Sequence, residues 1–498
     1  MGSFNEPWRD YFKNSNSELV IGIVQTVGTD SQPVLSYIKD ALRPFGYKTE
    51  IIKVSEMIIS SFDTQDKQFE NEYDRITYYM DLGNKVREMT NDGAVLMEGV
   101  TAYIYSEHHK DEYKPQRIAY IIDSLKHTDE VDFLRGVYGE GFHLIGISET
   151  EENRKNYLHN QKNISVAQAG KLIARDSNES NKNGQHARDT FEQADYFIDA
   201  GRDKLYLEAS VKRLFELIFG NPFISPQFEE YAMFRAYAAS LRSADLSRQI
   251  GAVIARGEDI LAEGVNDCTK AFGGLYWPYY NEDTHKIEDE PNGRDYTLGY
   301  DSNKKEQSQL IRNILDNFEM DYNEENIRKI KSAGIGSLTE YGRVVHSEME
   351  ALMMCARNGI VTRNCDMYVT TFPCHNCAKH IIDAGIRSVI YIEPYPKSKA
   401  LDFYNNEITT DEKDNTKVLF RPFNGVGPHR FMDLFSMKST RWYKRVRKGS
   451  DGNAIPWDAK KASVRNPMRI SNYRELESLS YSRYYNILKS LENMEEEQ

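Results

Sequence analysis

Four residues in the second half of the chain have the types and the spacing that a catalytic zinc site requires. His346 and Glu348 stand two residues apart in the run HSE, and Cys374 and Cys377 stand three apart in the run PCHNC. Side chains three residues apart on a helix share one face, and the positive end of a helix favours thiolates, the form of cysteine that binds metal. The two cysteines and His346 would therefore hold Zn²⁺ and leave its fourth position open for water.

Glu348 is the residue expected to move protons beside that metal. Zinc lowers the pKa of a bound water from about 16 toward roughly 7, and Glu348 would take the released proton and deliver it to the substrate. Because Glu348 is two residues from His346, the two side chains do not point the same way. The order H-x-E, a gap of 24 residues and P-C-x-x-C is the signature of zinc nucleobase deaminases. The pattern predicts hydrolysis of cytosine to uracil and ammonia, with Glu348 as the catalytic residue.

The cysteine pair allows two other interpretations. A C-x-x-C pair can be a redox couple, although the surrounding sequence does not resemble thioredoxin. A structural zinc site would need a fourth ligand, and the chain has no second C-x-x-C to supply it. The nearby cysteines and histidines that remain as candidates are Cys355, Cys365, His375 and His380. We expect Cys355 to be a small buried side chain on the apolar face of its helix, and His375 to point away from the metal.

The residues before position 150 alternate between apolar strands and helices. The apolar runs that indicate strands lie at 18–25, 48–54, 92–100, 117–125 and 142–149. This alternation is typical of a doubly wound parallel sheet. A helix at 205–220 follows, and the two prolines of 221–227 mark a linker.

The candidate zinc site lies in a second α/β pattern. It begins with a helix at 228–247 and two strands within 250–267, and it resumes at 346 with alternating helices and strands up to 394. We therefore expect two α/β domains, 1–225 and 226–498. The second is interrupted by a polar insertion at about 268–340 and is followed by an extension at about 437–498.

The composition fits a cytoplasmic protein that acts on a small substrate. The chain has 498 residues and a net charge of −13, which argues against a protein whose main task is coating nucleic acid. Its five cysteines are too few for a disulfide framework. No apolar run approaches the ~20 residues of a membrane span, and the first residues lack the apolar core of a signal peptide. The basic run RWYKRVRKG at 441–449 is either a solvated surface segment or a phosphate-binding patch.

The second domain resembles the deoxycytidylate deaminases, which have the α/β/α cytidine deaminase fold. The matching segments are, in order, RQIGAVIARGEDILAEGVND, HSEMEAL and YVTTFPCHNCAKHIIDAGIRSVIY. The resemblance implies that Asn266 contacts the nucleotide sugar and that Tyr395 lies near the phosphate. It also implies that Thr371 and Phe372 lie beside the base. Without the resemblance, Asn266 reads as a turn residue, and Tyr395 as an aromatic that simply packs.

The whole chain resembles one group more specifically, the bacterial anti-phage deoxycytidine nucleotide deaminases. Segments such as GQHARDTFEQADYFID, GRDYTLGYDSN and FRPFNGVGPHRFMDLF carry this resemblance over about residues 20–436. It implies a P-loop-like N-terminal domain and deamination of dCTP, dCMP or both, which depletes the nucleotide pool that an infecting phage needs. Related deaminases form oligomers, so we expect a homo-oligomer here.

The glycine turn near the N-terminus departs from a nucleotide-binding P-loop. A Walker A loop reads G-x-x-x-x-G-K-[ST], whereas here five residues separate Gly22 from Gly28, and Thr29 stands where the lysine belongs. Backbone N–H groups of such a turn can still bind phosphate, so Gly22, Gly28 and Thr29 are candidates for a nucleotide site. The alternative is a degenerate scaffold without a ligand.

Two rival functions share the zinc motif. A polynucleotide deaminase acting on tRNA or single-stranded DNA would need a basic groove with stacking aromatic side chains, and 441–448 is the run of that kind. A sensor or toxin would use its N-terminal domain to bind a nucleotide, RNA or phage-derived ligand that restrains the deaminase. The sensor reading is compatible with a nucleotide deaminase, because an unrestrained enzyme would harm its host.

Overall fold

The computed structural model describes residues 17–62, 68–108, 116–177, 187–395, 398–437, 447–466 and 468. Contacts between residues divide the chain into two compact units. The first consists of Met1–Ala194, Ala200–Ile224 and Asp433–Gln498, and the second of Asp195–Asp199 and Ser225–Met432. Of the basic run at 441–449, residues 441–446 lie outside the described residues.

The first unit is built on a parallel sheet. Its strands are β1 (Leu19–Gln25), β2 (Lys48–Lys53), β3 (Ile118–Leu125) and β4 (Phe142–Ser148), hydrogen-bonded in the order β4-β1-β3-β2. Strands β1 and β4 are mainly apolar and are buried except at their last residue, as expected of parallel strands covered on both faces. The alternation predicted from the sequence is therefore present.

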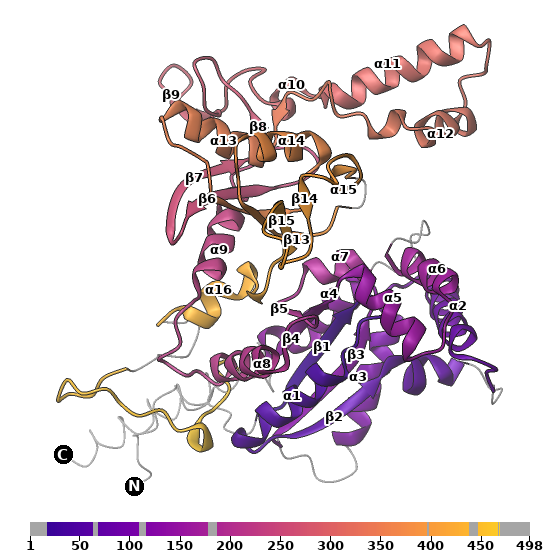
Figure 1. The fold of residues 1–498 in the computed structure, drawn as a ribbon, viewed down its shortest axis with the longest axis vertical. Helices are drawn as coiled ribbons and strands as arrows, with labels where there is room; N and C mark the ends of the chain where they lie inside the picture. Colours follow the sequence, from indigo (N-terminus) through magenta and orange to yellow (C-terminus); the bar gives the residue numbers. More distant parts are fainter. Residues whose placement is uncertain are drawn as a thin grey trace, which may run out of the picture. The chain divides into compact units, whose positions relative to one another are not determined.

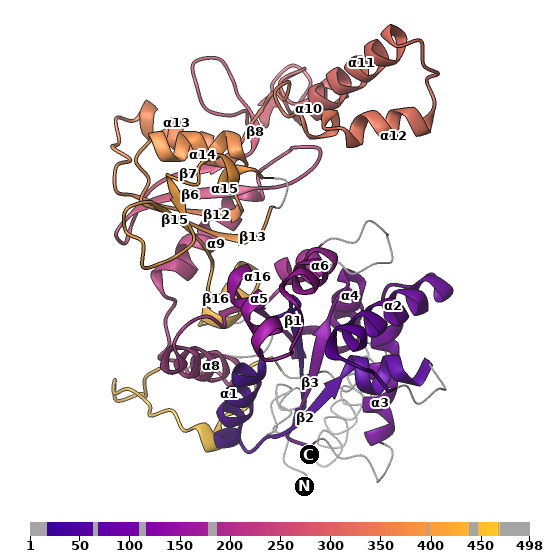
Figure 2. The ribbon, with the colours of Figure 1, turned by 45° about the vertical axis from the view of Figure 1, so that its right-hand side comes forward.

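Helices cover both faces of this sheet. Figure 2 shows α1 (Gln32–Leu42) and α8 (Lys204–Ile218) on one side and α3 (Val95–His108) and α4 (Thr128–Tyr138) on the other. The remaining helices of the unit are α2 (Glu72–Thr90), α5 (Glu151–Asn160), α6 (Val166–Ser177) and α7 (Ala187–Glu192). None of the helices in the described part of the chain has the length and apolar content needed to cross a bilayer.

The strand predicted at 92–100 is wrong, because these residues begin helix α3. The buried side chains of this segment include Leu96, Met97, Val100 and Ile104, a spacing that places them on one helical face. A short apolar run does not distinguish a buried strand from a buried helix, and here the helix continues to His108.

The C-terminal segment groups with the first unit, whereas the sequence analysis expected it to extend the second domain. Arg465 donates from its main chain to Ile218 O at 2.9 Å and from Nη1 to Leu434 O at 2.6 Å. The Trp457 ring lies 5.9 Å from that of Phe45, centroid to centroid. The contacts with Ile218 and Phe45 join segments more than 200 residues apart, and no local pattern in the sequence indicates them.

The second unit contains a six-stranded mixed sheet in the order β14-β15-β13-β12-β6-β7. Its strands are β6 (Gly251–Arg256), β7 (Asp259–Val265), β12 (Asp366–Thr371), β13 (Ser388–Glu393), β14 (Ile408–Thr409) and β15 (Val418–Pro422). Strands β12 to β15 run parallel, and β6 is antiparallel to both of its neighbours. In Figure 1, α9 (Phe228–Ser240) lies on one face, and α13 (Ser347–Arg357) and α14 (His375–Asp383) lie on the other. The unit is thus an α/β/α layer structure.

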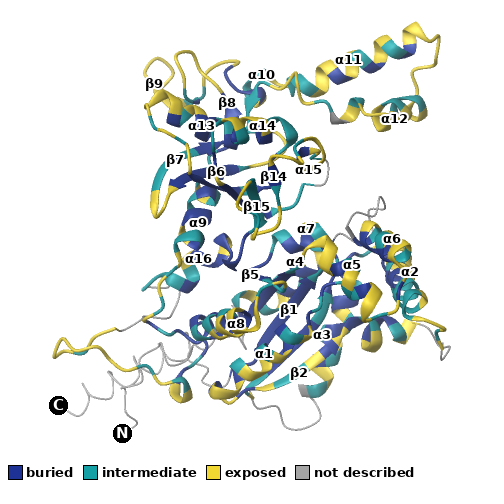
Figure 3. Cartoon of the chain, in the orientation of Figure 1, coloured by how far each residue is buried: buried dark blue, intermediate teal, exposed yellow. Residues whose placement is uncertain are grey.

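Between β7 and α13 the chain leaves this sheet and returns. The short strands β8 (Asp267–Cys268) and β11 (Val344–Val345) pair antiparallel at the base of the excursion. It contains β9 (Tyr279–Asn281), β10 (Lys286–Glu288), α10 (Asp295–Leu298), α11 (Ser302–Asn317) and α12 (Glu324–Ser332). Figure 3 shows the strands of the sheet largely buried and the α11–α12 pair largely exposed. The base matters for the site, because β11 ends directly before His346.

The last elements of the second unit are short. They are β5 (Tyr196–Asp199), α15 (Ala400–Phe403), β16 (Gly425–Val426) and the start of α16 (Pro428–Phe435). Strands β5 and β16 pair antiparallel, and Glu230 of α9 accepts the main-chain N–H of Val426 at 2.9 Å.

Candidate metal centre and active site

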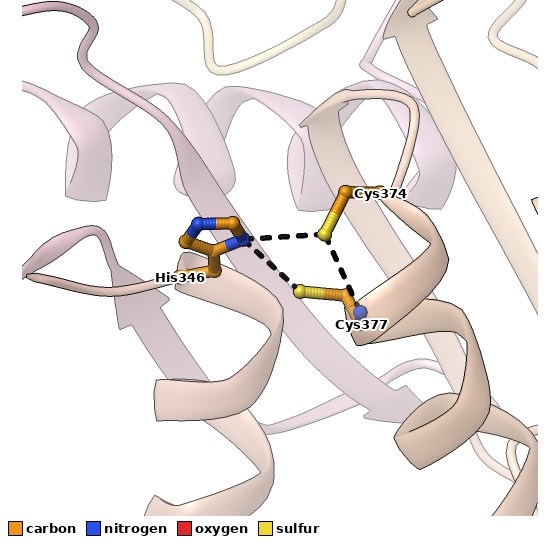
Figure 4. A group of neighbouring side chains, drawn as sticks. All are labelled: His346, Cys374 and Cys377. Carbon is orange, nitrogen blue, oxygen red and sulfur yellow. Dashed lines mark hydrogen bonds between the residues drawn. The ribbon is translucent and has the colours of Figure 1, made fainter. Parts of the chain in front are cut away.

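Two helix N-termini bring the three predicted metal ligands together. His346 is the N-cap residue of α13, and Cys374 is the N-cap residue of α14, with Cys377 in the first turn of that helix. The His346 Nδ1 atom lies 3.4 Å from the Cys374 sulfur and 3.3 Å from the Cys377 sulfur. Figure 4 shows the imidazole and both thiols pointing toward one another.

These donors fit a zinc ion. The three ligand atoms all lie within 4.8 Å of one another. Zinc binds sulfur at about 2.3 Å and imidazole nitrogen at about 2.0–2.1 Å, so a tetrahedral site would separate nitrogen from sulfur by about 3.6 Å. The two nitrogen–sulfur distances are within a few tenths of an ångström of that value.

A fourth protein ligand is not found among the described residues, where the group of donors consists of His346, Cys374 and Cys377. Cys355 and Cys365 are fully buried in the hydrophobic core of the unit, as was expected of Cys355. The His375 ring packs against Phe403 at 5.7 Å between centroids, and His380 is exposed. Three ligands are the number that catalytic zinc sites use, whereas structural sites use four.

Hydrogen bonds among the donors decide which of them carries charge. Those from Cys377 and then from His346 lower the pKa of the Cys374 thiol to about 4, against the effect of its burial. The bond to Cys374 raises the pKa of His346 to about 9. Because Cys377 donates to the Cys374 sulfur, the pKa of Cys377 is raised. A cation among the donors would displace the protons that they share, since zinc binds thiolates and neutral imidazole.

Glu348 lies in the first turn of α13, two residues after His346. Its side chain is buried, and the Ser347 hydroxyl donates to its Oε2 at 3.1 Å. Burial raises the pKa of the Glu348 carboxyl group, while the charge of His346 acts in the opposite direction. A raised pKa brings a carboxyl group closer to the pH at which it can both accept and return a proton.

Gly264 in β7 lets α13 approach the sheet closely. A Cβ atom at this position would lie 2.0 Å from Ser347 O and 2.4 Å from Ala351 N. Main-chain atoms cannot yield as the end of a flexible side chain would, so a larger residue must push α13 away from β7. Because His346 is the N-cap residue of α13 and Glu348 lies in its first turn, Gly264 helps to set the position of the site.

Gly264→Ala should therefore weaken zinc binding as well as folding. We expect a loss of about 1–3 kcal/mol in the free energy of unfolding, the usual cost of overpacking, together with weaker zinc binding in competition with a chelator. Gly136→Ala in α4 is the matched control, since a Cβ there meets nothing within 4 Å. Full zinc affinity in a destabilised Gly264→Ala protein would contradict the link between β7 and the site.

The Asn266 side chain shapes the loop before β6. Its Nδ2 donates to Arg248 O at 2.8 Å, and its Oδ1 accepts from Ile250 N at 2.7 Å. The Ser243 hydroxyl donates to the Asn266 carbonyl oxygen at 2.6 Å. An amide can make further hydrogen bonds beyond these two, and the contact with a nucleotide sugar stays a prediction.

The other residues expected at the substrate lie at or just after the ends of β12 and β13. The Thr371 hydroxyl donates to Glu393 Oε2 at 2.6 Å, and Phe372 is buried in the core of the unit. Tyr395 packs against the same core, and burial followed by the charge of Cys374 raises its pKa. Their roles toward a substrate stay predictions.

Arg248 and Glu393 were not singled out from the sequence. Arg248 forms an ion pair with Glu393, and its guanidinium carbon lies 5.9 Å from the centroid of the Tyr395 ring. Half of the Arg248 side chain is exposed, so the cation is available to an anionic group of a ligand. A basic residue just before a strand and an acidic residue ending another were visible in the sequence, but no spacing rule connects them.

Two of the three N-terminal candidates lie in the turn that follows β1. Gly28 has a φ of +88° and Thr29 is buried. Gly22 lies inside β1 instead, where a Cβ atom would come within 2.8 Å of the Phe142 ring. Gly22 therefore packs closely against the neighbouring strand, and the nucleotide-binding roles of Gly22, Gly28 and Thr29 stay predictions.

The metal donors lie in a segment that matches the model of a known protein family. Residues 226–393 match the family model of the cytidine and deoxycytidylate deaminase zinc-binding region. The match runs from just before α9 to the end of β13 and contains His346, Glu348, Cys374 and Cys377.

Curated relatives match over shorter stretches. The ComE operon protein 2 of Bacillus subtilis is 45% identical over 53 residues, which are 11% of this chain and 28% of the relative. The deoxycytidylate deaminase of Mus musculus is 46% identical over 98 residues, 20% of this chain and 47% of the relative. That of Enterobacteria phage T4 is 44% identical over 55 residues, 11% of this chain and 28% of the relative. The chain spans less than half the length of each of these relatives.

Solved structures give weaker matches. A dCMP deaminase of the cyanophage S-TIM5 in complex with dCMP and dUMP is 16% identical, with a TM-score of 0.23 over 40% of this chain and 100% of that one. The protein TT1252 of Thermus thermophilus is 13% identical, with a TM-score of 0.26 over 40% of this chain and 97% of that one. These scores are too low to carry an argument. Residues 226–393 of this chain are thus similar to the zinc-binding region of the cytidine and deoxycytidylate deaminases.

Proposed function

We propose that the protein is a zinc-dependent hydrolase that deaminates free deoxycytidine nucleotides, converting dCMP, dCTP or both to the deoxyuridine nucleotides. One observation supports this proposal above all others. His346 Nδ1 and the sulfurs of Cys374 and Cys377 lie close together, near the buried carboxyl group of Glu348. All four residues lie in the region that matches the deaminase family model.

In the proposed mechanism the chain holds the metal and moves the protons. His346, Cys374 and Cys377 would hold Zn²⁺, which would supply the Lewis acidity that activates a water for attack on C4 of cytosine. Glu348 accepts one proton of that water and donates it to N3 of the ring. Glu348 then passes the second proton to the amino group, which leaves C4 as ammonia. Cytosine and water thus give uracil and ammonia.

A free nucleotide is the proposed substrate because the cation of Arg248 lies beside Tyr395, the residue predicted to be near the phosphate. The Arg248 guanidinium group lies next to Tyr395 and is held by Glu393, and a guanidinium group is well suited to bind phosphate oxygens. Two of the matched relatives are named deoxycytidylate deaminases, which favours deoxycytidine nucleotides.

The proposed biological role is depletion of the deoxycytidine nucleotide pool during phage infection. The resemblance of the whole chain to the anti-phage deaminases supports it, as does the fusion of the deaminase region to a separate α/β unit. We further propose that this N-terminal unit is P-loop-like and restrains the enzyme until a ligand binds, and that the protein acts as a cytoplasmic homo-oligomer.

A substrate panel tests the proposed activity. Zinc-loaded full-length protein is incubated with dCMP, dCDP, dCTP, CTP and a cytosine-containing single-stranded oligonucleotide, and ammonia and uracil products are measured. We expect turnover of dCMP or dCTP, slower reaction of CTP and none of the oligonucleotide. Preferential turnover of the oligonucleotide would replace this proposal with a polynucleotide deaminase.

A further inference from the structure

The carboxyl ends of β12 and β13 carry a pair of opposite charges near the metal donors. Strand β12 ends at Thr371, three residues before Cys374, and β13 ends at Glu393, which pairs with Arg248. Burial and then the charge of Cys374 raise the pKa of the Tyr395 hydroxyl, and the charges of Arg248 and Glu393 act on the same group. One tyrosine thus lies within reach of both the metal donors and the pair.

The Glu393 carboxylate is held at both of its oxygens. Its Oε1 accepts from Arg248 Nη1, and its Oε2 accepts the Thr371 hydroxyl at 2.6 Å. The two strands place Thr371 and Glu393 directly opposite each other, so the hydroxyl cannot leave without disturbing the sheet. Because the Glu393 side chain is only 17% exposed, solvent ions screen its charge weakly. The carboxylate is therefore a fixed negative charge at this end of the sheet.

Arg248 is fixed along its main chain and open along its side chain. Asp245 Oδ1 accepts its main-chain N–H at 2.9 Å, and its carbonyl oxygen accepts Asn266 Nδ2 at 2.8 Å. Half of the side chain is exposed, and among the residues that the structure describes Glu393 is its ion-pair partner. A guanidinium group has five N–H donors, so most of them stay available to an anion. A phosphate bound there would lie beside the Glu393 carboxylate.

We propose that Glu393 is a specificity-determining residue, whose fixed charge weakens the binding of a nucleoside triphosphate more than that of a monophosphate. The inference rests on the proposed function, in which Arg248 binds the substrate phosphate. Coulomb repulsion from a fixed carboxylate grows with the negative charge of the ligand, and each added phosphate adds such charge. The single charge of Arg248 is already balanced by Glu393, so the pair gives the further phosphates no net attraction.

Neutralising the carboxylate tests the proposal. Glu393→Gln removes the charge and keeps the contacts, because the amide oxygen can accept from Arg248 and the amide N–H can donate to the Thr371 hydroxyl. Zinc-loaded full-length protein is titrated calorimetrically with dUMP and dUTP, and kcat and KM are measured for dCMP and dCTP. The ratio of dUTP affinity to dUMP affinity should rise at least about fivefold in the variant. The same change should appear in the ratio of KM values rather than in kcat, and added salt should shrink it.

Asp366→Asn is the matched control, because it repeats the arrangement at the opposite end of the same two strands. Asp366 begins β12, and its Oδ1 accepts from Arg387 Nε at 3.1 Å and from the Ser388 hydroxyl at 2.6 Å. This change removes a carboxylate held by an arginine and a hydroxyl group, as Glu393→Gln does, but far along the strands from the metal donors. The ratio of the two affinities should stay that of the unmodified protein.

The outcomes separate this inference from the proposed function. An unchanged affinity ratio in Glu393→Gln, or an equal rise in Asp366→Asn, overturns the role of Glu393 even where dCMP or dCTP is deaminated. A raised ratio without turnover of either nucleotide supports that role and overturns the proposed function, and failure to bind dUMP and dUTP overturns both. If Glu393→Gln does not fold, Glu393→Met, which keeps the length of the side chain without its charge, takes its place in the same titrations.

Discussion

Glu348→Gln should abolish deamination while zinc stays bound. The amide keeps the size of the side chain and can still accept a hydrogen bond from Ser347, so the buried environment is preserved. It cannot carry a proton between water, ring nitrogen and amino group, and a missing proton carrier typically costs about 10²–10⁴ in rate. We expect a loss in kcat at or above that range. Zinc content measured by mass spectrometry should remain that of the unmodified protein.

Glu350→Gln provides the matched control for this change. Glu350 lies in the same turn of α13 and is also buried, but its carboxylate pairs with Arg357 at 2.6 Å. Its neutralisation should lower stability through the broken ion pair and leave most of kcat. Activity that survives in Glu348→Gln, or is lost equally in Glu350→Gln, would remove Glu348 from its proposed role.

The metal site could be predicted from the sequence because its geometry is local. Cys374 and Cys377 are fixed relative to each other by one helical turn, and His346 and Glu348 by the start of another. The site also requires that the N-termini of α13 and α14 lie side by side. Gly264 contributes to this because it allows α13 to lie close against β7. Residue types and short spacings therefore carried most of the information about the site.

The parts that could not be predicted depend on contacts between distant segments. Arg248 meets Glu393 across 145 positions, and Val27 meets Asp176 across 149. In the N-terminal turn the missing lysine of the Walker pattern suggested a weak site. Lys126, which directly follows the neighbouring strand β3, donates to Gln25 O just before that turn, and a motif that compares adjacent residues cannot register this contact.

Cys377→Ala should remove zinc, activity and the stabilisation that zinc provides. Only one thiol and His346 would remain as donors within the group of three, and two ligands hold the ion far less tightly than three. Any ion that binds the folded state stabilises it by about 2.7 kcal/mol when its free concentration is 100 times its dissociation constant. We therefore expect the unmodified protein to show a zinc-dependent rise in melting temperature that is absent in Cys377→Ala.

Cys365→Ala separates loss of the metal from loss of a buried sulfur. Both cysteines are buried in the same core cluster, but the Cys365 thiol donates weakly to Val361 O and is not among the metal donors. This variant should lose packing energy of about the same size and keep its zinc, its activity and its zinc-dependent shift in melting temperature. A Cys377→Ala protein with full zinc content would show that the ion is held elsewhere, and the assignment of Cys374 and His346 would fall with it.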